Sequence, residues 1–130
     1  MLVMPGTPFD PAALARALPL VRLLVLHGSR ARKEAHQGSD WDFAYLADDG
    51  SDELEVRLFL SRWLGTDAID LVDLSRAGGL LRYRAAGEGN VLYERESGEF
   101  EQFALRAIFF WLDAAPALRP AYQAVLENLG

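Results

Sequence analysis

The sequence alternates short apolar runs with segments of helical periodicity. Val21–His27 is the most compact run of branched and apolar residues, and it predicts a buried strand. Asp40–Ala47 alternates large and small side chains with the period of two that is typical of a strand. Ala68–Leu74 and Asn90–Glu94 predict two further strands. Strands interleaved with helices indicate a single α/β-type domain.

Two amphipathic helices are predicted in the first half of the chain. Asp10 followed by Pro11 is typical of an N-cap and a first helical position, and the helix should run to about Leu18. Ser51 is expected to cap a second helix that ends at Gly65. The apolar residues that we expect on the core face of this second helix are Leu54, Leu58 and Trp63.

The second half of the chain is mainly helical. Arg76–Ala86 predicts one helix, and Glu99–Ala115 predicts a stronger one that Pro116 should stop, with a final helix over Ala117–Leu129. The stronger helix carries two apolar stripes, which is more than one core face needs. The first stripe is Phe100, Phe103, Ala107, Ile108 and Trp111, and the second is Leu105, Phe109 and Leu112. Either the final helix covers the second stripe, or that stripe is a protein interface.

Composition limits the classes of function. At 130 residues the chain fits one domain, residues 1–130, with a helical C-terminal segment at about 99–130. It has no cysteine, which excludes disulfides and thiolate metal sites, and its net charge of -6 argues against DNA or RNA as a bulk partner. We find no signal peptide and no apolar run near the ~20 residues that cross a bilayer, so we expect a soluble, cytoplasmic protein.

One group of residues has the pattern of a catalytic site. Gly28 and Ser29 lie between the first predicted strand and a helical turn at Ser29–Ala35, and free backbone N–H groups in such a turn suit a phosphate. Ten residues separate Ser29 from Asp40 and Asp42, whose side chains share one face of a strand. Paired carboxylates repel unless cations lie between them, and their oxygens suit Mg²⁺. The pattern therefore indicates phosphoryl or nucleotidyl transfer.

A third carboxylate is expected on a neighbouring strand. Asp70 and Asp73 face opposite sides of the strand Ala68–Leu74, so only one can join the site. Asp70 lies inside the apolar run, where an unpaired charge is costly, whereas Asp73 is near the end of the strand and can be satisfied by water or a cap. We therefore predict that Asp70 is the third acid.

These residues resemble the DNA polymerase beta-like nucleotidyltransferases, and most closely the minimal nucleotidyltransferase (MNT) branch. The resemblance covers roughly residues 20–95 and includes the stretches 28–32, 39–43, 69–74 and 89–94. It implies an α/β (α+β) fold with a small mixed β-sheet flanked by helices. Two positions depart from the family pattern: Lys33 stands where glycine is frequent, and Trp41 stands where an aliphatic residue is usual.

The resemblance also implies roles for residues. Asp40, Asp42 and Asp70 would be the catalytic acids and would bind two Mg²⁺ ions. The nucleotide, ATP, would be bound by Gly28, Ser29, Arg30 and Ser39. Arg30 and Arg32 could contact the triphosphate or an acidic acceptor, or they could be ordinary surface arginines.

Members of this branch are often encoded beside a HEPN-domain toxin. They act as antitoxins that transfer AMP from ATP to a tyrosine of the toxin, so the resemblance implies that reaction and a homo- or hetero-oligomeric state. Two alternatives stay open: nucleotidyl transfer to a small-molecule hydroxyl, and a non-catalytic antitoxin that binds its toxin. A chain of 130 residues leaves little room for a dedicated small-molecule pocket, which favours the protein acceptor.

Overall fold

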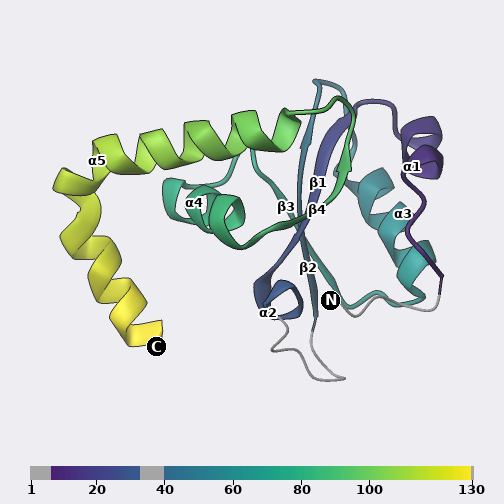
Figure 1. Cartoon of the computed structure of the whole chain (residues 1–130). Helices are drawn as coiled ribbons and strands as arrows, with labels where there is room; N and C mark the ends of the chain where they lie inside the picture. The colour runs from purple at the N-terminus through teal and green to yellow at the C-terminus, as the bar shows by residue number, and fades with distance from the viewer. Residues whose placement is uncertain (1–6, 33–39, 130) are drawn as a thin grey trace.

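The computed structural model describes residues 7–32 and 40–129 and contains one mixed β-sheet with helices on both faces (Figure 1). The elements in chain order are α1 (Pro11–Ala17), β1 (Val21–His27), α2 (Gly28–Ala31), β2 (Trp41–Ala47), α3 (Glu53–Leu64), β3 (Ile69–Asp73), α4 (Gly79–Glu88), β4 (Asn90–Glu94) and α5 (Glu99–Leu129). The predicted α/β (α+β) class, with a small mixed sheet flanked by helices, is confirmed.

The strand order is β3-β2-β1-β4. β1 pairs antiparallel with both β2 and β4, whereas β2 and β3 are parallel. The parallel pair needs a crossover connection, and α3 supplies it. As a result, the C-terminal end of β1 and the N-terminal ends of β2 and β3 lie next to one another. They form one edge of the sheet, namely the edge made by the ends of the strands.

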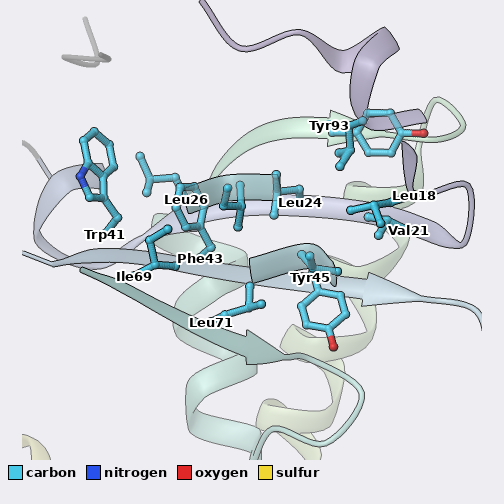
Figure 2. Close-up of a cluster of buried hydrophobic side chains, with 13 residues drawn as sticks. Leu18, Val21, Leu24, Leu26, Trp41, Phe43, Tyr45, Ile69, Leu71 and Tyr93 are labelled. Carbon is cyan, nitrogen blue, oxygen red and sulfur yellow. The ribbon is translucent and has the colours of Figure 1, made fainter. Parts of the chain in front are cut away.

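The two faces of the sheet bury separate cores. α1 and α3 cover one face, where a row of side chains from all four strands packs against Leu14 and Leu60 (Figures 1 and 2). α4 and α5 cover the other face, where the smaller core contains Ala85, Phe103 and Ala107. The alternation predicted for β2 is present, since Phe43 lies in the first core and Ala44 in the second.

Two details predicted for α3 are wrong. Its N-cap is Asp52, whose Oδ1 accepts a hydrogen bond from the Leu54 backbone N–H at 2.9 Å, and not Ser51. Leu54 and Leu58 are exposed, and the buried residues are Val56 and Leu60. The predicted Trp63 does pack against the core. The helix carries more than one row of apolar residues, and contact with α1 and the sheet selects the row that is buried. The end of the helix at Gly65, with φ +70°, is as predicted.

α4 begins at Gly79, three residues later than predicted. The Oδ1 atom of Asp73 accepts hydrogen bonds from the Ser75 backbone N–H at 2.9 Å and from the Ser75 hydroxyl at 2.7 Å. A short polar side chain that folds back on the backbone in this way favours a turn. The chain therefore turns after β3 before the helix can start.

α5 does not stop at Pro116, because one helix runs over Glu99–Leu129 and bends part-way along (Figure 1). Proline removes one backbone hydrogen bond and crowds the preceding turn, which can kink a helix without ending it. The final segment also leaves the second apolar stripe uncovered: Leu105, Phe109 and Leu112 are 46%, 60% and 55% exposed. The interpretation that the last helix covers this stripe is therefore wrong.

A helix with the length and apolar sequence needed to cross a bilayer is absent from the part of the chain that the structure describes.

Candidate active site

The turn after β1 lies directly against the carboxylate of Asp42. Gly28 follows the last residue of β1 and has φ +71°, a conformation that glycine adopts without a steric penalty. A Cβ atom added at Gly28 would overlap with Oδ2 of Asp42. Only a residue without a side chain therefore allows the turn and the carboxylate to lie so close.

Asp42 and Asp70 lie opposite each other in the parallel β2–β3 ladder. Side chains of directly opposed residues point to the same face of a sheet. Asp40 immediately precedes β2 and is exposed. Asp73 lies opposite Tyr45 at the far end of the ladder, where its carboxylate binds Ser75. The structure thus brings Asp40, Asp42 and Asp70 to one edge and places Asp73 elsewhere.

The pKa of Asp42 is raised above its ordinary value. The main cause is burial, which disfavours the charged form, and the negative charges of Asp70 and Asp40 raise the pKa further. The positive charges of His27 and Arg32 oppose this shift. Asp42 is therefore the carboxylate of this edge whose charged form is disfavoured both by burial and by its two acidic neighbours.

The raised pKa sets the sign of a pH effect on stability. Folded Asp42 holds its proton more tightly than unfolded Asp42, so its contribution is present below about pH 4 and is lost as pH rises through the folded pKa. In metal-free buffer, the stability of Asp42→Asn relative to the wild type should therefore rise as the pH increases above about 4, by at most about 1 kcal/mol because solvent screens the site. Urea unfolding at several pH values measures this difference, and a difference that falls with pH contradicts the assignment.

Asp70 is exposed, which corrects the expectation that it would be buried in an apolar run. β3 is an edge strand, so the face that carries Asp70 is open at this position even though Ile69 and Leu71 are buried. The argument from the cost of burial therefore does not select Asp70 over Asp73. The register opposite Asp42 does so instead.

The donor chemistry of this edge suits a hard cation such as Mg²⁺, which prefers carboxylate oxygens. The missing side chain at Gly28 lets the backbone of the turn lie directly against the Asp42 carboxylate. Within residues 7–32 and 40–129, however, no three acidic or histidine side chains are close enough together to form a metal site. The three aspartates have the right chemistry for Mg²⁺ and lie at the same edge of the sheet. In this structure, however, their carboxylates are too far apart for all three to bind one ion.

Three residues beside the site were not predicted to belong to it, namely His27, Asn90 and Glu88. His27 lies opposite Asp42 in the β1–β2 ladder, and its Nε2 atom is buried without a hydrogen-bond partner. Asn90 Nδ2 donates to the Ala31 carbonyl at 3.3 Å, and Arg32 Nη1 pairs with Glu88 Oε2 at 3.3 Å. Asn90 and Glu88 thus tie the last turn of α2 to the β4 side of the sheet. The position of His27 directly before Gly28 was the available signal.

The remaining predicted nucleotide ligands are Ser29, Arg30 and Ser39. Ser29 is partly buried in α2, next to Gly28. The Arg30 guanidinium carbon is 4.0 Å from the centroid of the Trp41 ring. Ser39, like Lys33, lies outside the described residues. A cavity of about 810 Å³ between α1 and α3 is on the other face of the sheet from Asp42 and contributes nothing to this edge.

The sequence pattern of the family "Polymerase beta, Nucleotidyltransferase" matches residues 13–98, which is more than half of the chain. The chain belongs to this nucleotidyltransferase family. The match spans the Gly28 turn and all three predicted acids, so the edge described above coincides with the part of the chain that defines the family. The predicted family and enzyme class are confirmed.

Known members of the family include close relatives of this chain. A protein adenylyltransferase MntA from Aphanizomenon flos-aquae is 34% identical in an alignment of 128 positions. The alignment covers 89% of this chain and 83% of the relative. A chain in the crystal structure of a toxin–antitoxin with AMP-PNP has a TM-score of 0.71 and 28% identity, over 88% of this chain and 94% of that one. A chain from the complex of a tri-AMPylated Shewanella oneidensis HEPN toxin with its MNT antitoxin has a TM-score of 0.64 and 25% identity, over 88% and 91%.

Proposed function

We propose that this nucleotidyltransferase transfers AMP from ATP to a tyrosine hydroxyl of a HEPN-domain toxin partner. The observation that carries the proposal is the packing of the Gly28 turn on Asp42, with Asp70 opposite Asp42 in the ladder. It unites a turn suited to phosphate with carboxylates suited to a cation. The relatives support the acceptor, since one is a protein adenylyltransferase and another was solved with an AMPylated HEPN toxin.

In this proposal the turn binds the phosphates of ATP. Gly28 and Ser29 offer backbone N–H groups at the end of β1, and the missing side chain at Gly28 brings this turn into contact with Asp42. Arg30 and Ser39 are further proposed ligands of the nucleotide. A toxin–antitoxin relative solved with AMP-PNP supports ATP as the donor. The proposal also sets the reaction in the cytoplasm, where ATP is available.

Asp40, Asp42 and Asp70 would hold two Mg²⁺ ions. When bound, such ions neutralise the charge on phosphate oxygens and on the leaving group. The partial burial of Asp42 serves this role, since a carboxylate that is poorly solvated gains more from a neighbouring cation than one in bulk water. The exposure of Asp40 and Asp70 leaves the edge open to a nucleotide from solvent.

The proposed transfer breaks one phosphorus–oxygen bond and forms another. The tyrosine oxygen attacks the α-phosphorus of ATP in line with the bond to the bridging oxygen, and pyrophosphate leaves with that bonding pair. The hydroxyl proton passes to solvent. The role of this chain's residues is to hold the α-phosphate at the open edge, where a tyrosine from another protein can reach it.

The exposed stripe of α5 gives this partner a surface to bind. Leu105, Phe109 and Leu112 are each about half exposed, and contiguous apolar surface of this kind marks association sites. The net charge of -6 would favour a basic partner through complementary fields. We therefore propose that the stripe contributes to a stable hetero-oligomer with the toxin.

The proposal is tested with the product of the adjacent gene. The chain, ATP and Mg²⁺ should add the mass of one AMP group to a tyrosine of that protein, and the two proteins should elute together from a size-exclusion column. Intact-mass and peptide mass spectrometry measure the modification, and ATP alone with the neighbouring protein is the control. A complex in which the partner carries no AMP would indicate a non-catalytic antitoxin that only binds its toxin. AMP found only on a small molecule would indicate transfer to a small-molecule hydroxyl. Either result overturns the proposal.

A further inference from the structure

Trp41 occupies an unusual place between two of the predicted metal ligands, Asp40 and Asp42. Its side chain is 9% exposed and stacks on Phe43 with ring centroids 6.4 Å apart and nearly parallel planes. Figure 2 shows Trp41 at one end of the row of core side chains. Because side chains alternate along a strand, the indole lies on the opposite face of β2 from Asp42. Trp41 therefore cannot itself ligate a cation held by Asp42.

Arg30 lies on the face of this indole. Its guanidinium carbon is 4.0 Å from the ring centroid, well inside the distance of about 6 Å at which a cation–π contact is attractive. Both partners are withheld from bulk water, since Arg30 is only partly exposed and Trp41 is buried. Such contacts are stronger when they are desolvated.

The start of β2 is therefore held by α2 from both faces. Gly28 packs on Asp42 on one face, and Arg30, two residues later, packs on Trp41 on the other. Two further contacts hold the same turn: the Asn90 side chain donates to the Ala31 carbonyl, and Arg32, which follows α2, pairs with Glu88. Movement of Arg30 would carry Gly28 and Ser29 with it.

We propose that Trp41 is a positioning residue that fixes the phosphate-binding turn through Arg30. The inference rests on the proposed binding of ATP at this turn and adds a residue to which no role in that binding is otherwise assigned. An aliphatic residue at position 41 would fill part of the core but would present no π face to the guanidinium. Substitution of Trp41 should therefore weaken ATP binding without touching the carboxylates.

A double-mutant cycle tests the coupling. The dissociation constant of AMP-PNP with Mg²⁺ is measured by calorimetry for the wild type, Trp41→Met, Arg30→Ala and the double variant. Trp41→Met should weaken binding roughly three- to thirtyfold in the presence of Arg30 and less than about twofold in its absence. With the toxin substrate, the KM for ATP should rise while kcat changes less, and Trp41→Phe, which keeps a π face, should restore most of the affinity.

Arg82→Ala is the matched control, because Arg82 also lies over an aromatic ring, that of Phe103 at 5.8 Å, but on α4. Its effect should be additive with that of Trp41→Met. Additive effects of Trp41→Met and Arg30→Ala, or a Trp41→Phe variant as weak as Trp41→Met, would overturn the inference.

A fluorescence measurement keeps the test independent of replacing Trp41. In a chain with Trp63→Phe and Trp111→Phe, Trp41 is the remaining tryptophan of three. Arg30→Ala should change its emission, and AMP-PNP at a saturating concentration should alter that emission only when Arg30 is present. No change on either step contradicts the inference. A wild-type chain that fails to bind AMP-PNP overturns the proposed function instead, while the effect of Arg30→Ala alone still reports the contact.

Discussion

Asp42→Asn should lower AMP transfer by on the order of a thousandfold or more and leave the protein folded. A bound cation contributes several kcal/mol to stabilising the transition state, and the neutral amide is a poor ligand for a hard cation. Asp42 lies against Gly28 and opposite Asp70, so its loss removes the central carboxylate of the edge. Transfer of labelled AMP to the toxin measures the activity, and thermal unfolding in metal-free buffer measures the fold.

The melting temperature of Asp42→Asn should be unchanged or a few degrees higher. The amide removes the charge that burial and the two neighbouring carboxylates disfavour, while its shape fits the same space. Asp73→Asn is the matched control, since Asp73 lies at the other end of the β2–β3 ladder and binds Ser75. That variant should keep transfer and lose a little stability. An Asp42→Asn protein that unfolds would mean that Asp42 is structural, and a folded variant that retains transfer would mean that Asp42 has no catalytic role.

Gly28→Ala should abolish detectable ATP binding and reduce transfer by at least about a hundredfold. The new Cβ would overlap with Oδ2 of Asp42, so the turn, the carboxylate or both must move. A displacement of about 1 Å in a catalytic arrangement costs about that factor. The positive φ adds a further cost of about 1–2 kcal/mol to the folded state.

Gly65→Ala separates the two effects of a substitution at Gly28, which are the strain of a positive φ and the overlap with Asp42. Gly65 has φ +70°, close to the +71° of Gly28, but among the described residues beyond its own chain neighbours no atom lies within 4 Å of the place of its Cβ. Gly65→Ala should therefore lose similar stability and keep full activity. If the two variants had equal activity at a temperature where both are folded, the close packing of Gly28 on Asp42 would have no catalytic role.

Local signals in the sequence were sufficient for most of the fold. β1 and β4 have the predicted bounds, and Asp10 caps α1 by accepting from the Ala12 and Ala13 backbone N–H groups. These elements follow from short-range chemistry: a compact apolar run, a cap, a proline. The Gly28–Asp42 spacing also led to the family by resemblance, because that motif is local in sequence.

The features that were predicted wrongly or missed share a cause: each is determined by contacts between distant parts of the chain. Whether Leu58 or Leu60 of α3 is buried depends on where α1 lies, and the exposure of Asp70 depends on β3 being the edge strand. α5 continues through Pro116 to Leu129, and the Arg30–Trp41 contact joins residues from α2 and β2. None of these features is encoded in a window of neighbouring residues.

The parallel pairing of β2 with β3 links the site to the course of folding. Asp42 and Asp70 are separated in sequence by the whole of α3, so they meet only after the crossover has docked on the sheet. Long-range parallel pairing is slow to form, because chain entropy is lost before its contacts are gained. During synthesis and refolding, the chain would pair β1 with β2 before it paired the two carboxylates, and nucleotide affinity would report that the β2–β3 pairing is complete.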